Sequence, residues 1–460
     1  MTSTLTTDAT VVVLGLGVAG RACAKALTAR GYRVVAIEDR PTDSTLAFAS
    51  ENDVELLASP DAADRAGAFQ GAGAFLPSPG VPEHHPAFAE AAQAGVPVIS
   101  EFDLARWWDD RPLIGITGTD GKTSVTLLTV AMLESSGIRA AGVGNTETPL
   151  VEAIDDPDYE VFVVEASSFR LGHSAEFSPV AAAWLNFSPD HLDVHASLER
   201  YELAKAKIWS SIPHDGLVVA PIDDAVVLGH LPPDRDTVIV SPTSLDASDE
   251  PVRDGARIGH VRDGQLVLDG QPLVAIDDLA RAFPHDISNA LTAAALASRL
   301  GATVDAIAAA LRNFVLPPHR IQHIRTLDGV DYYNDSKATV PHAVVTAVES
   351  FEHVVLIAGG RNKGIDLTPM SEAANRIRAV VAIGDAADEI EAAFIDRVPT
   401  VRSADLEDAV GQARTLATPG DVVLLSPGCT SFDAYGSYGE RGDHFISIVE
   451  QLEPETQEAL

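Results

Sequence analysis

The sequence has little lysine, little cysteine and no long apolar run. Only six of its 32 basic residues are lysine, and its 460 residues include only two cysteines, at positions 23 and 429. These cysteines lie far apart and match no metal-ligand spacing, which argues against a disulfide framework or a zinc site. No run approaches the roughly 18 apolar residues of a membrane span, and residues 1–10 lack the basic and apolar regions of a signal peptide. We therefore expect a cytoplasmic protein with no membrane span.

Positive charge is also scarce. The chain carries 67 acidic and 32 basic residues, for a net charge of -35, and this excess repels nucleic acid and anionic membranes. We expect no nucleic-acid partner, and any anionic substrate must meet local cations. Because arginine is the usual cation here, the retained lysines are candidates for chemistry that a guanidinium cannot perform. Chance retention is the alternative, and it suits Lys25 among its alanines.

The length and the order of apolar segments predict an α/β protein of several domains. At 460 residues, the chain is too long for one hydrophobic core. Strand-like and helix-like segments alternate along most of it, as parallel sheets require. We place three domains at residues 1–101, 102–316 and 317–460.

A glycine-rich turn follows the first predicted strand. The strand from Thr10 runs into Gly15-x-Gly17-x-x-Gly20, a helical pattern continues to about Ala29, and a second strand ends in acidic residues. This pattern is the dinucleotide fingerprint. It also fits a turn that is merely tight, or a turn that holds another diphosphate. Further strands are expected over residues 73–77 and 96–99.

A second phosphate loop lies between Leu113 and Thr126. An apolar strand, a glycine-rich turn and a Lys-Thr pair precede a helical pattern, so Lys122 is positioned to reach phosphates and Thr123 to bind a metal ion. The loop is a variant, because Ile116 stands where the usual P-loop has glycine. Glu165 ends a neighbouring predicted strand, where such proteins place a Mg²⁺-binding acid.

Other candidates are weaker when taken singly. His191 lies near carboxylates, including Asp193, yet a lone loop histidine more often has a packing or surface role. Lys205 and Lys207 are two apart on a predicted helix, so at most one points into a given site. Two later segments, residues 359–363 and 426–433, follow strands at the edge where open α/β sheets bind ligands.

Taken together, these motifs resemble those of the Mur ligases, the ATP-dependent amino-acid-adding enzymes of bacterial cell-wall synthesis. The resemblance covers nearly the whole chain. Its marks are Thr117-Gly-Thr-Asp-Gly-Lys-Thr123, Glu165-Ala-Ser-Ser-Phe169, Asp190-His-Leu-Asp193, Ala204-Lys205, Pro318-His-Arg320, Asn334-Asp-Ser-Lys-Ala-Thr339 and Ser426-Pro-Gly-Cys-Thr-Ser-Phe-Asp433.

The resemblance implies a fold and a reaction. The expected fold has Rossmann-like N- and C-terminal domains and a central P-loop-type ATP-binding α/β domain. The expected reaction adds D-glutamate to UDP-N-acetylmuramoyl-L-alanine through an acyl phosphate, in peptidoglycan precursor synthesis. The expected cofactors are ATP and two Mg²⁺ ions, and we expect a monomer whose only partners are small-molecule substrates.

The resemblance also implies a role for each site residue. Catalysis falls to Lys122, Glu165, His191 and Lys205. ATP would contact Gly118, Thr119, Asp120, Gly121, Lys122, Thr123, Ser124, Asn289, Arg320 and Asp335. The UDP substrate would contact Gly15, Leu16, Gly17, Val18, Asp39, Arg40, Ser78, Gly80, Asn145 and Ser167. The incoming amino acid would contact Lys337, Thr339, Lys363, Ser431, Phe432 and Tyr438. Metal ligands would be Thr123, Glu165, His191 and Lys205, the last as a carbamate.

Some positions depart from the family pattern, and alternative functions stay open. Asp120 replaces the commoner Asn, Arg170 the usual Gln, Asp286 an Asn, and Tyr438 a Phe. A surface ammonium paired with an acid is the alternative for Lys205. An NAD-dependent oxidoreductase, a non-catalytic nucleotide switch, or a related ligase that adds a different amino acid are the alternatives for the whole chain.

Overall fold

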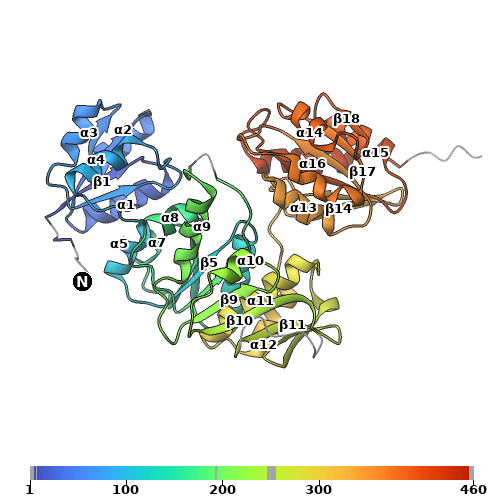
Figure 1. Ribbon diagram of the computed structural model, residues 1–460, viewed down its shortest axis with the longest axis horizontal. Helices are drawn as coiled ribbons and strands as arrows, with labels where there is room; N and C mark the ends of the chain where they lie inside the picture. Colours follow the sequence, from blue (N-terminus) through green and yellow to red (C-terminus); the bar gives the residue numbers. More distant parts are fainter. Residues whose placement is uncertain (1–4, 7, 147, 192–193, 246–254, 455–460) are drawn as a thin grey trace, which may run out of the picture. The chain divides into compact units, whose positions relative to one another are not determined.

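The computed structural model describes residues 5–6, 8–146, 148–191, 194–245 and 255–454 (Figure 1). The chain divides into two compact units, Met1–Phe314 and Val315–Leu460. The first unit contains two sheets and the second contains one. The predicted domain boundaries after residues 101 and 316 remain predictions.

The first sheet has four parallel strands in the order β3-β2-β1-β4. Its strands are β1 (Thr10–Leu14), β2 (Arg33–Glu38), β3 (Glu55–Ala58) and β4 (Ala74–Pro77), and its helices are α1 (Val18–Ala29), α2 (Asp43–Glu51), α3 (Ala62–Ala68) and α4 (Pro86–Ala94). Apolar side chains of β1 alternate between the two faces, so each face of the sheet has its own core. The strand expected over residues 96–99 is wrong, because only a single bridge forms there, between Phe75 and Val98.

The second sheet has nine strands in the order β13-β12-β11-β10-β9-β8-β5-β7-β6. Its strands are β5 (Leu113–Thr117), β6 (Ala140–Gly144), β7 (Val161–Glu165), β8 (Ala181–Trp184), β9 (Leu217–Pro221), β10 (Asp236–Ser244), β11 (Arg257–Arg262), β12 (Gln265–Leu268) and β13 (Gln271–Ala275). Following the order in the sheet, every neighbouring pair from β6 through β7, β5, β8, β9 and β10 to β11 is parallel. The pairs β11–β12 and β12–β13 are antiparallel.

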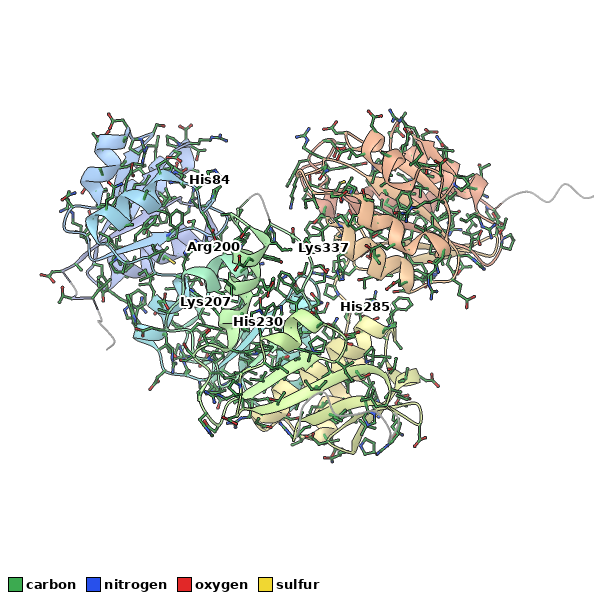
Figure 2. All side chains as sticks on the ribbon, viewed as in Figure 1. His84, Arg200, Lys207, His230, His285 and Lys337 are labelled. Atoms are coloured by element: carbon green, nitrogen blue, oxygen red, sulfur yellow. The ribbon has the colours of Figure 1, made fainter. Side chains whose placement is uncertain are left out.

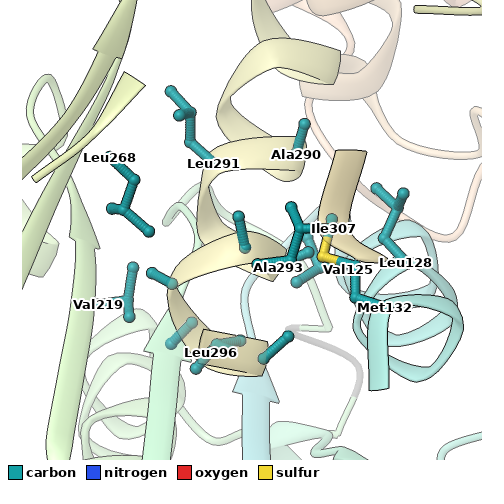
Figure 3. Packing of buried hydrophobic residues seen from close by; sticks show 14 of the residues in the cluster. Val125, Leu128, Met132, Val219, Leu268, Ala290, Leu291, Ala293, Leu296 and Ile307 are labelled. Atoms are coloured by element: carbon teal, nitrogen blue, oxygen red, sulfur yellow. The ribbon is translucent and has the colours of Figure 1, made fainter. Parts of the chain in front are cut away.

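Ten helical segments accompany this sheet. They are α5 (Glu101–Trp108), α6 (Lys122–Ser135), α7 (Leu150–Ala153), α8 (Ser168–His173), α9 (Leu198–Ala206), η1 (Lys207–Trp209), α10 (Ala225–Gly229), η2 (Ile276–Asp278), α11 (Pro284–Arg299) and α12 (Val304–Asn313). Helices α6, α11 and α12 pack together over one face, where Met132, Leu291, Leu296 and Ile307 are fully buried (Figure 3). This packing anchors α6, and therefore fixes the end of the phosphate loop from which α6 starts.

The second unit has a six-stranded sheet in the order β14-β15-β19-β16-β17-β18. Its elements are β14 (Gln322–Leu327), β15 (Val330–Asn334), α13 (Pro341–Glu349), β16 (Val354–Gly359), η3 (Thr368–Arg376), β17 (Ile377–Ile383), α14 (Ala387–Phe394), β18 (Thr400–Arg402), α15 (Leu406–Leu416), β19 (Val422–Gly428) and α16 (Tyr438–Gln451). Only β14 runs antiparallel to its neighbour. Within the part of the chain that is described, every helix is too short or too polar to cross a bilayer.

Candidate active site

The first glycine-rich loop connects β1 to α1 by a very close approach of backbone to backbone. Gly15 has a φ of 84°, and a Cβ placed on Gly20 would lie 2.0 Å from the Gly15 carbonyl oxygen. Ser78, from the turn after β4, donates its hydroxyl to that same oxygen at 2.6 Å. The fold thus brings the predicted residues Gly15 and Ser78 together, although they are 63 positions apart.

The acid that holds this loop is Glu38, which the sequence analysis did not select. Its carboxylate accepts the Leu16 backbone N–H at 2.9 Å and the Arg40 N–H at 3.4 Å. The selected neighbour, Asp39, instead faces His85 at 2.9 Å. The position of Glu38 at the end of β2 was the available signal, since the fingerprint expects an acid there.

The rest of this predicted set also lies around the loop. Gly17 immediately precedes α1, and a Cβ placed on it would meet no atom of the described residues within 4 Å. Val18 is largely exposed. Gly80 adopts a φ of 87° in the turn that contains Ser78.

The backbone of the second loop, residues 117–122, is held by hydrogen bonds to the side chain of Asn186. The Asn186 side-chain oxygen accepts the backbone N–H groups of Thr119 and Asp120, both at 2.9 Å. Gly121 then takes a φ of 81° and starts α6, which leaves the amides of the first helical turn available to an anion. Sequence reasoning missed Asn186, which acts across 67 positions.

Lys122 lies across its own loop. Its Nζ donates to the carbonyls of Gly118 (2.9 Å) and Thr119 (2.8 Å). Asn289 of α11 reaches the same place, because a Cβ placed on Gly121 would be 2.8 Å from its side-chain oxygen. Thr123 and Ser124 follow in the first turn of α6, half-buried.

Glu165 ends β7, the strand beside β5, and pairs in register with Ile116. One of its carboxylate oxygens, Oε1, accepts the Asn145 side-chain N–H at 3.1 Å. The other, Oε2, is buried and has no hydrogen-bond partner among the described residues. A buried carboxylate oxygen without a donor is costly, so this oxygen is chemically suited to a cation.

Lys205 of α9 is completely buried beneath the loop. Its Nζ donates to the Gly118 carbonyl at 2.6 Å and lies 4.6 Å from the centre of the Tyr201 ring. Burial, and next the nearby Lys122 cation, hold the pKa of Lys205 well below its ordinary value. An amine with a lowered pKa is available in its neutral, nucleophilic form, and this buried position does not match a surface ammonium.

Lys207 points elsewhere, as predicted. Its Nζ donates to the Gly172 carbonyl at 2.6 Å, whereas that of Lys205 donates to the Gly118 carbonyl. Figure 2 labels Lys207, the first residue of η1, together with Arg200 of the preceding helix α9.

His191 lies in the same neighbourhood as Lys205. It has a φ of 55°, unusual for a residue other than glycine, and its Nε2 is 3.2 Å from Asp190. Its ring centre is 4.9 Å from that of Phe169 and 6.1 Å from that of Tyr201. The predicted neighbour Asp193 lies outside the described residues.

Two departures from the family pattern have structural partners. Asp286 forms a two-point ion pair with Arg281, at 2.6 and 2.7 Å, and accepts the Phe283 N–H at the start of α11. Arg170 forms a buried ion pair with Glu101 at 2.7 Å. Ser167 caps α8 by accepting the Arg170 backbone N–H at 3.4 Å.

In the second unit, the predicted segments converge at the carboxyl edge of the sheet. The loops after β16 and β19 are joined by paired backbone bonds between Arg361 and Thr430. Arg441 of α16, buried and unselected by the sequence analysis, donates to Ser336 at 2.9 Å and to the Cys429 carbonyl at 3.2 Å. Desolvation lowers the pKa of Arg441 to about 10.

This edge places a half-buried cation beside an aromatic ring. The Nζ of Lys337 lies 3.8 Å from the centre of the Tyr438 ring. Lys363 and Phe432 follow closely after the two joined residues Arg361 and Thr430, and both are exposed. Thr339 is half-buried and Ser431 is buried.

Of the two predicted nucleotide residues of this unit, Arg320 lies in the turn before β14, and Asp335 directly follows β15 and contacts that turn. Asp335 accepts the Ile321 N–H at 3.1 Å and the Ser426 hydroxyl at 2.8 Å. Arg320 sits half-buried between two residues with positive φ, His319 and Ile321.

Three family models match the chain. They describe a Mur ligase MurD-like N-terminal domain (residues 9–100), a Mur ligase middle domain (116–297) and a Mur ligase glutamate ligase domain (319–429). The UDP-N-acetylmuramoylalanine--D-glutamate ligase of Frankia casuarinae is 41% identical, over 96% of this chain and 94% of its own. The chain belongs to the Mur ligase family. The enzyme of the same name from Thermobifida fusca is 37% identical over 96% of this chain and 98% of its own.

Solved structures share the Mur ligase fold at low sequence identity. A pseudomurein peptide ligase type C from Methanothermus fervidus has a TM-score of 0.61 at 16% identity, over 97% of this chain and all of that one. A MurF ligase from Thermotoga maritima in complex with ADP has a TM-score of 0.57 at 17% identity, over 91% of this chain and 94% of that one. The predicted three-domain α/β class is therefore confirmed.

Proposed function

We propose that this Mur ligase adds D-glutamate to UDP-N-acetylmuramoyl-L-alanine at the expense of ATP. The observation that carries the proposal is the near full-length similarity to D-glutamate-adding relatives, in a chain that keeps the phosphate loop with Lys122, the buried acid Glu165 and the buried amine Lys205. We further propose that the reaction takes place in the cytoplasm and that the enzyme acts as a monomer.

The phosphate loop would bind ATP. The amides at the start of α6 and the ammonium of Lys122 supply positive charge for the β- and γ-phosphates. To reach them, Lys122 exchanges its two loop carbonyls, Gly118 and Thr119, for phosphate oxygens. Asn289 lies against Gly121, where a nucleotide contact is expected, and Arg320 and Asp335 of the second unit are the further nucleotide residues.

The chemistry would proceed in two steps. The alanyl carboxylate of the UDP substrate attacks the γ-phosphorus of ATP, so an acyl phosphate forms and ADP leaves. The amine of D-glutamate then attacks the acyl carbon, the amide bond forms, and inorganic phosphate leaves with loss of a proton from the amine. Neither step needs a protein nucleophile, and positioning with charge neutralisation is the main requirement.

The residues would supply ligands for two Mg²⁺ ions. Thr123 and the donor-free oxygen of Glu165 would hold one ion, and His191 with a carbamate on Lys205 would hold the other. Carbamate formation requires a neutral amine to attack CO₂, which agrees with the lowered pKa of Lys205. Mg²⁺, when bound, neutralises charge on the phosphate oxygens. No group of three or more His, Cys, Asp or Glu suited to a metal occurs in the described residues, and these donor sets do not require one.

The two substrates would bind at opposite ends of the chain sequence. The loop of Gly15, Leu16, Gly17 and Val18, with Asp39, Arg40, Ser78 and Gly80, would bind the UDP moiety, and Asn145 and Ser167 its reacting end. Lys337, Thr339, Lys363, Ser431, Phe432 and Tyr438 would receive D-glutamate. The half-buried cation of Lys337 beside the Tyr438 ring suits a dicarboxylic amino acid.

An amino-acid panel tests the proposal directly. ADP formation by the full-length chain is measured with ATP, Mg²⁺ and UDP-N-acetylmuramoyl-L-alanine, in the presence of D-glutamate or of other amino acids. We expect turnover with D-glutamate alone, and loss of roughly 10²-fold or more in Lys122→Ala. Lys25→Ala, which removes an exposed lysine, is the matched control and should be unchanged. Equal turnover with another amino acid, or none with D-glutamate, would contradict the proposal.

A further inference from the structure

A continuous chain of hydrogen bonds connects Arg170 to the carboxylate of Glu165. The Arg170 Nε donates to Glu101 at 2.7 Å, and its NH1 donates to the side-chain oxygen of Asn145 at 3.2 Å. The side-chain nitrogen of Asn145 in turn donates to Glu165 Oε1 at 3.1 Å. Four side chains from α5, α8, the turn after β6 and the end of β7 thus form one network.

The chemistry of these groups allows only one orientation of the Asn145 amide. A guanidinium can donate but cannot accept, and an ionised carboxylate can accept but cannot donate. The amide must therefore turn its oxygen to Arg170 and its nitrogen to Glu165. A glutamine at position 170 would impose no such direction, since it can donate or accept. The Glu165 carboxylate by itself already requires the amide nitrogen, and Arg170, a departure from the family pattern, adds a group at the amide oxygen that can only donate.

From this geometry we propose that Arg170, balanced by Glu101, is a positioning residue for the metal-binding acid Glu165. It locks Asn145 so that Oε1 of Glu165 is held by a donor while Oε2 stays buried, with no donor among the residues that the structure describes. The inference rests on the proposed function, in which Glu165 binds a divalent cation. Residues that orient a metal ligand in this way typically contribute 10–100-fold to metal affinity.

Glu101 supplies the charge balance that makes an arginine tolerable here. The two side chains are 7% and 2% exposed, so the pair is almost fully buried. An unpaired guanidinium at this depth would oppose a divalent cation at Glu165. Glu101 also accepts the Val151 N–H at 3.3 Å, which fixes it at the start of α7.

The competing explanation is a purely structural ion pair. Arg170 and Glu101 would then only join α8 to α5, and removal of the pair would lower stability with no effect on metal binding. A double substitution separates the two explanations. Replacing both members of a buried pair with apolar residues is often neutral for stability, so Glu101→Leu/Arg170→Met can keep the fold while it removes the donor to Asn145.

Mn²⁺ binding is the readout, because it does not depend on turnover. Mn²⁺ is titrated into the full-length chain, free Mn²⁺ is measured by electron paramagnetic resonance, and unfolding is followed in parallel. Glu165→Gln identifies the site. Arg65→Met is the matched control, since it breaks the partly buried Arg65–Glu90 pair away from this network. Arg170→Lys keeps a donor and a charge.

We expect Mn²⁺ affinity to fall by about tenfold or more in Arg170→Met and in the double variant, to recover in part in Arg170→Lys, and to stay at the wild-type level in Arg65→Met. Wild-type affinity in the folded double variant would overturn the inference, as would affinity that Glu165→Gln does not change. If Arg170→Met fails to fold, the double variant decides. The same Mn²⁺ pattern without D-glutamate-dependent ADP formation would contradict the proposed function and leave the positioning role intact.

Discussion

Two glycines of the first loop should respond in opposite ways to alanine. A Cβ on Gly20 would lie 2.0 Å from the Gly15 carbonyl oxygen and 2.5 Å from the Ser78 hydroxyl. A Cβ on Gly17 would meet no atom within 4 Å in the described part of the chain. Gly20 therefore serves the fold, whereas Gly17 leaves open space at the start of α1, where a diphosphate would approach the backbone.

The structure sets the size of each effect on stability. In Gly20→Ala, overpacking costs about 1–3 kcal/mol and the strained Ser78–Gly15 hydrogen bond about 1 kcal/mol, while better helix propensity returns about 1 kcal/mol. The free energy of unfolding should thus fall by about 1–3 kcal/mol. In Gly17→Ala it should change by less than about 1 kcal/mol, because the extended backbone at this position suits alanine. Urea denaturation of the full-length chain measures both.

Substrate binding should show the opposite order. The Gly17→Ala methyl group would displace the diphosphate of the UDP substrate from backbone donors, and hydrogen bonds to charged groups contribute about 1.5–3 kcal/mol. The KM for the UDP substrate should therefore rise by about tenfold or more, with ATP and D-glutamate kept saturating. An unchanged KM in Gly17→Ala would refute this reasoning, and would mean that the glycines serve only the tight turn.

Substitutions at three other residues test the remaining features. Lys205→Ala and Lys205→Arg should both lose most ADP formation, since neither can carry a carbamate, and added formate or acetate should restore part of it only in the alanine variant; wild-type rates would exclude the carbamate. Burial lowers the pKa of His173 to about 4. As pH falls through about 6.5, this histidine is therefore protonated in the unfolded chain but not in the folded one. The free energy of unfolding should fall by about 1 kcal/mol between pH 7.5 and 5.5. His173→Phe, which keeps the ring stack with Phe88, should flatten that dependence in urea titrations at the two pH values, and an equal slope would refute it. Arg441→Met leaves the Ser336 carbonyl without its buried donor, so the second unit should become about 1–3 kcal/mol less stable, with earlier proteolysis as the readout.

Turns and strand ends were predictable because their causes are local in sequence. Gly15 and Gly121 occupy backbone conformations that favour glycine, and Glu165 ends an apolar run that becomes β7. The strand expected over residues 96–99 does not form, and the reason is also local. Pro97 has no N–H to donate, so the segment forms only the single bridge at Val98.

The supporting residues were not predictable, because each acts across a long stretch of chain. Asn186 holds a loop 67 positions earlier, and Arg441 reaches Ser336 across 105 positions. Neither belongs to a local pattern of spacing or periodicity. Glu38 lies at a position where the fingerprint expects an acid. However, Glu38 and Asp39 are adjacent acids at the end of one strand, and the sequence does not show which of them faces the loop.

The negative charge of Asp120 raises the pKa of Lys205. Burial and the Lys122 cation both lower the pKa of Lys205, and Asp190, Asp120 and Glu165 act in the opposite direction. Lys122 and Lys205 both donate to the Gly118 carbonyl. Without these acids, the two ammonium groups would repel each other in a partly buried site with no negative charge nearby, which is costly. With asparagine at position 120, only Asp190 and Glu165 would supply this negative charge. Asp120 therefore shifts the amine toward its charged form, and the depth at which α9 buries Lys205 is what keeps its neutral form accessible.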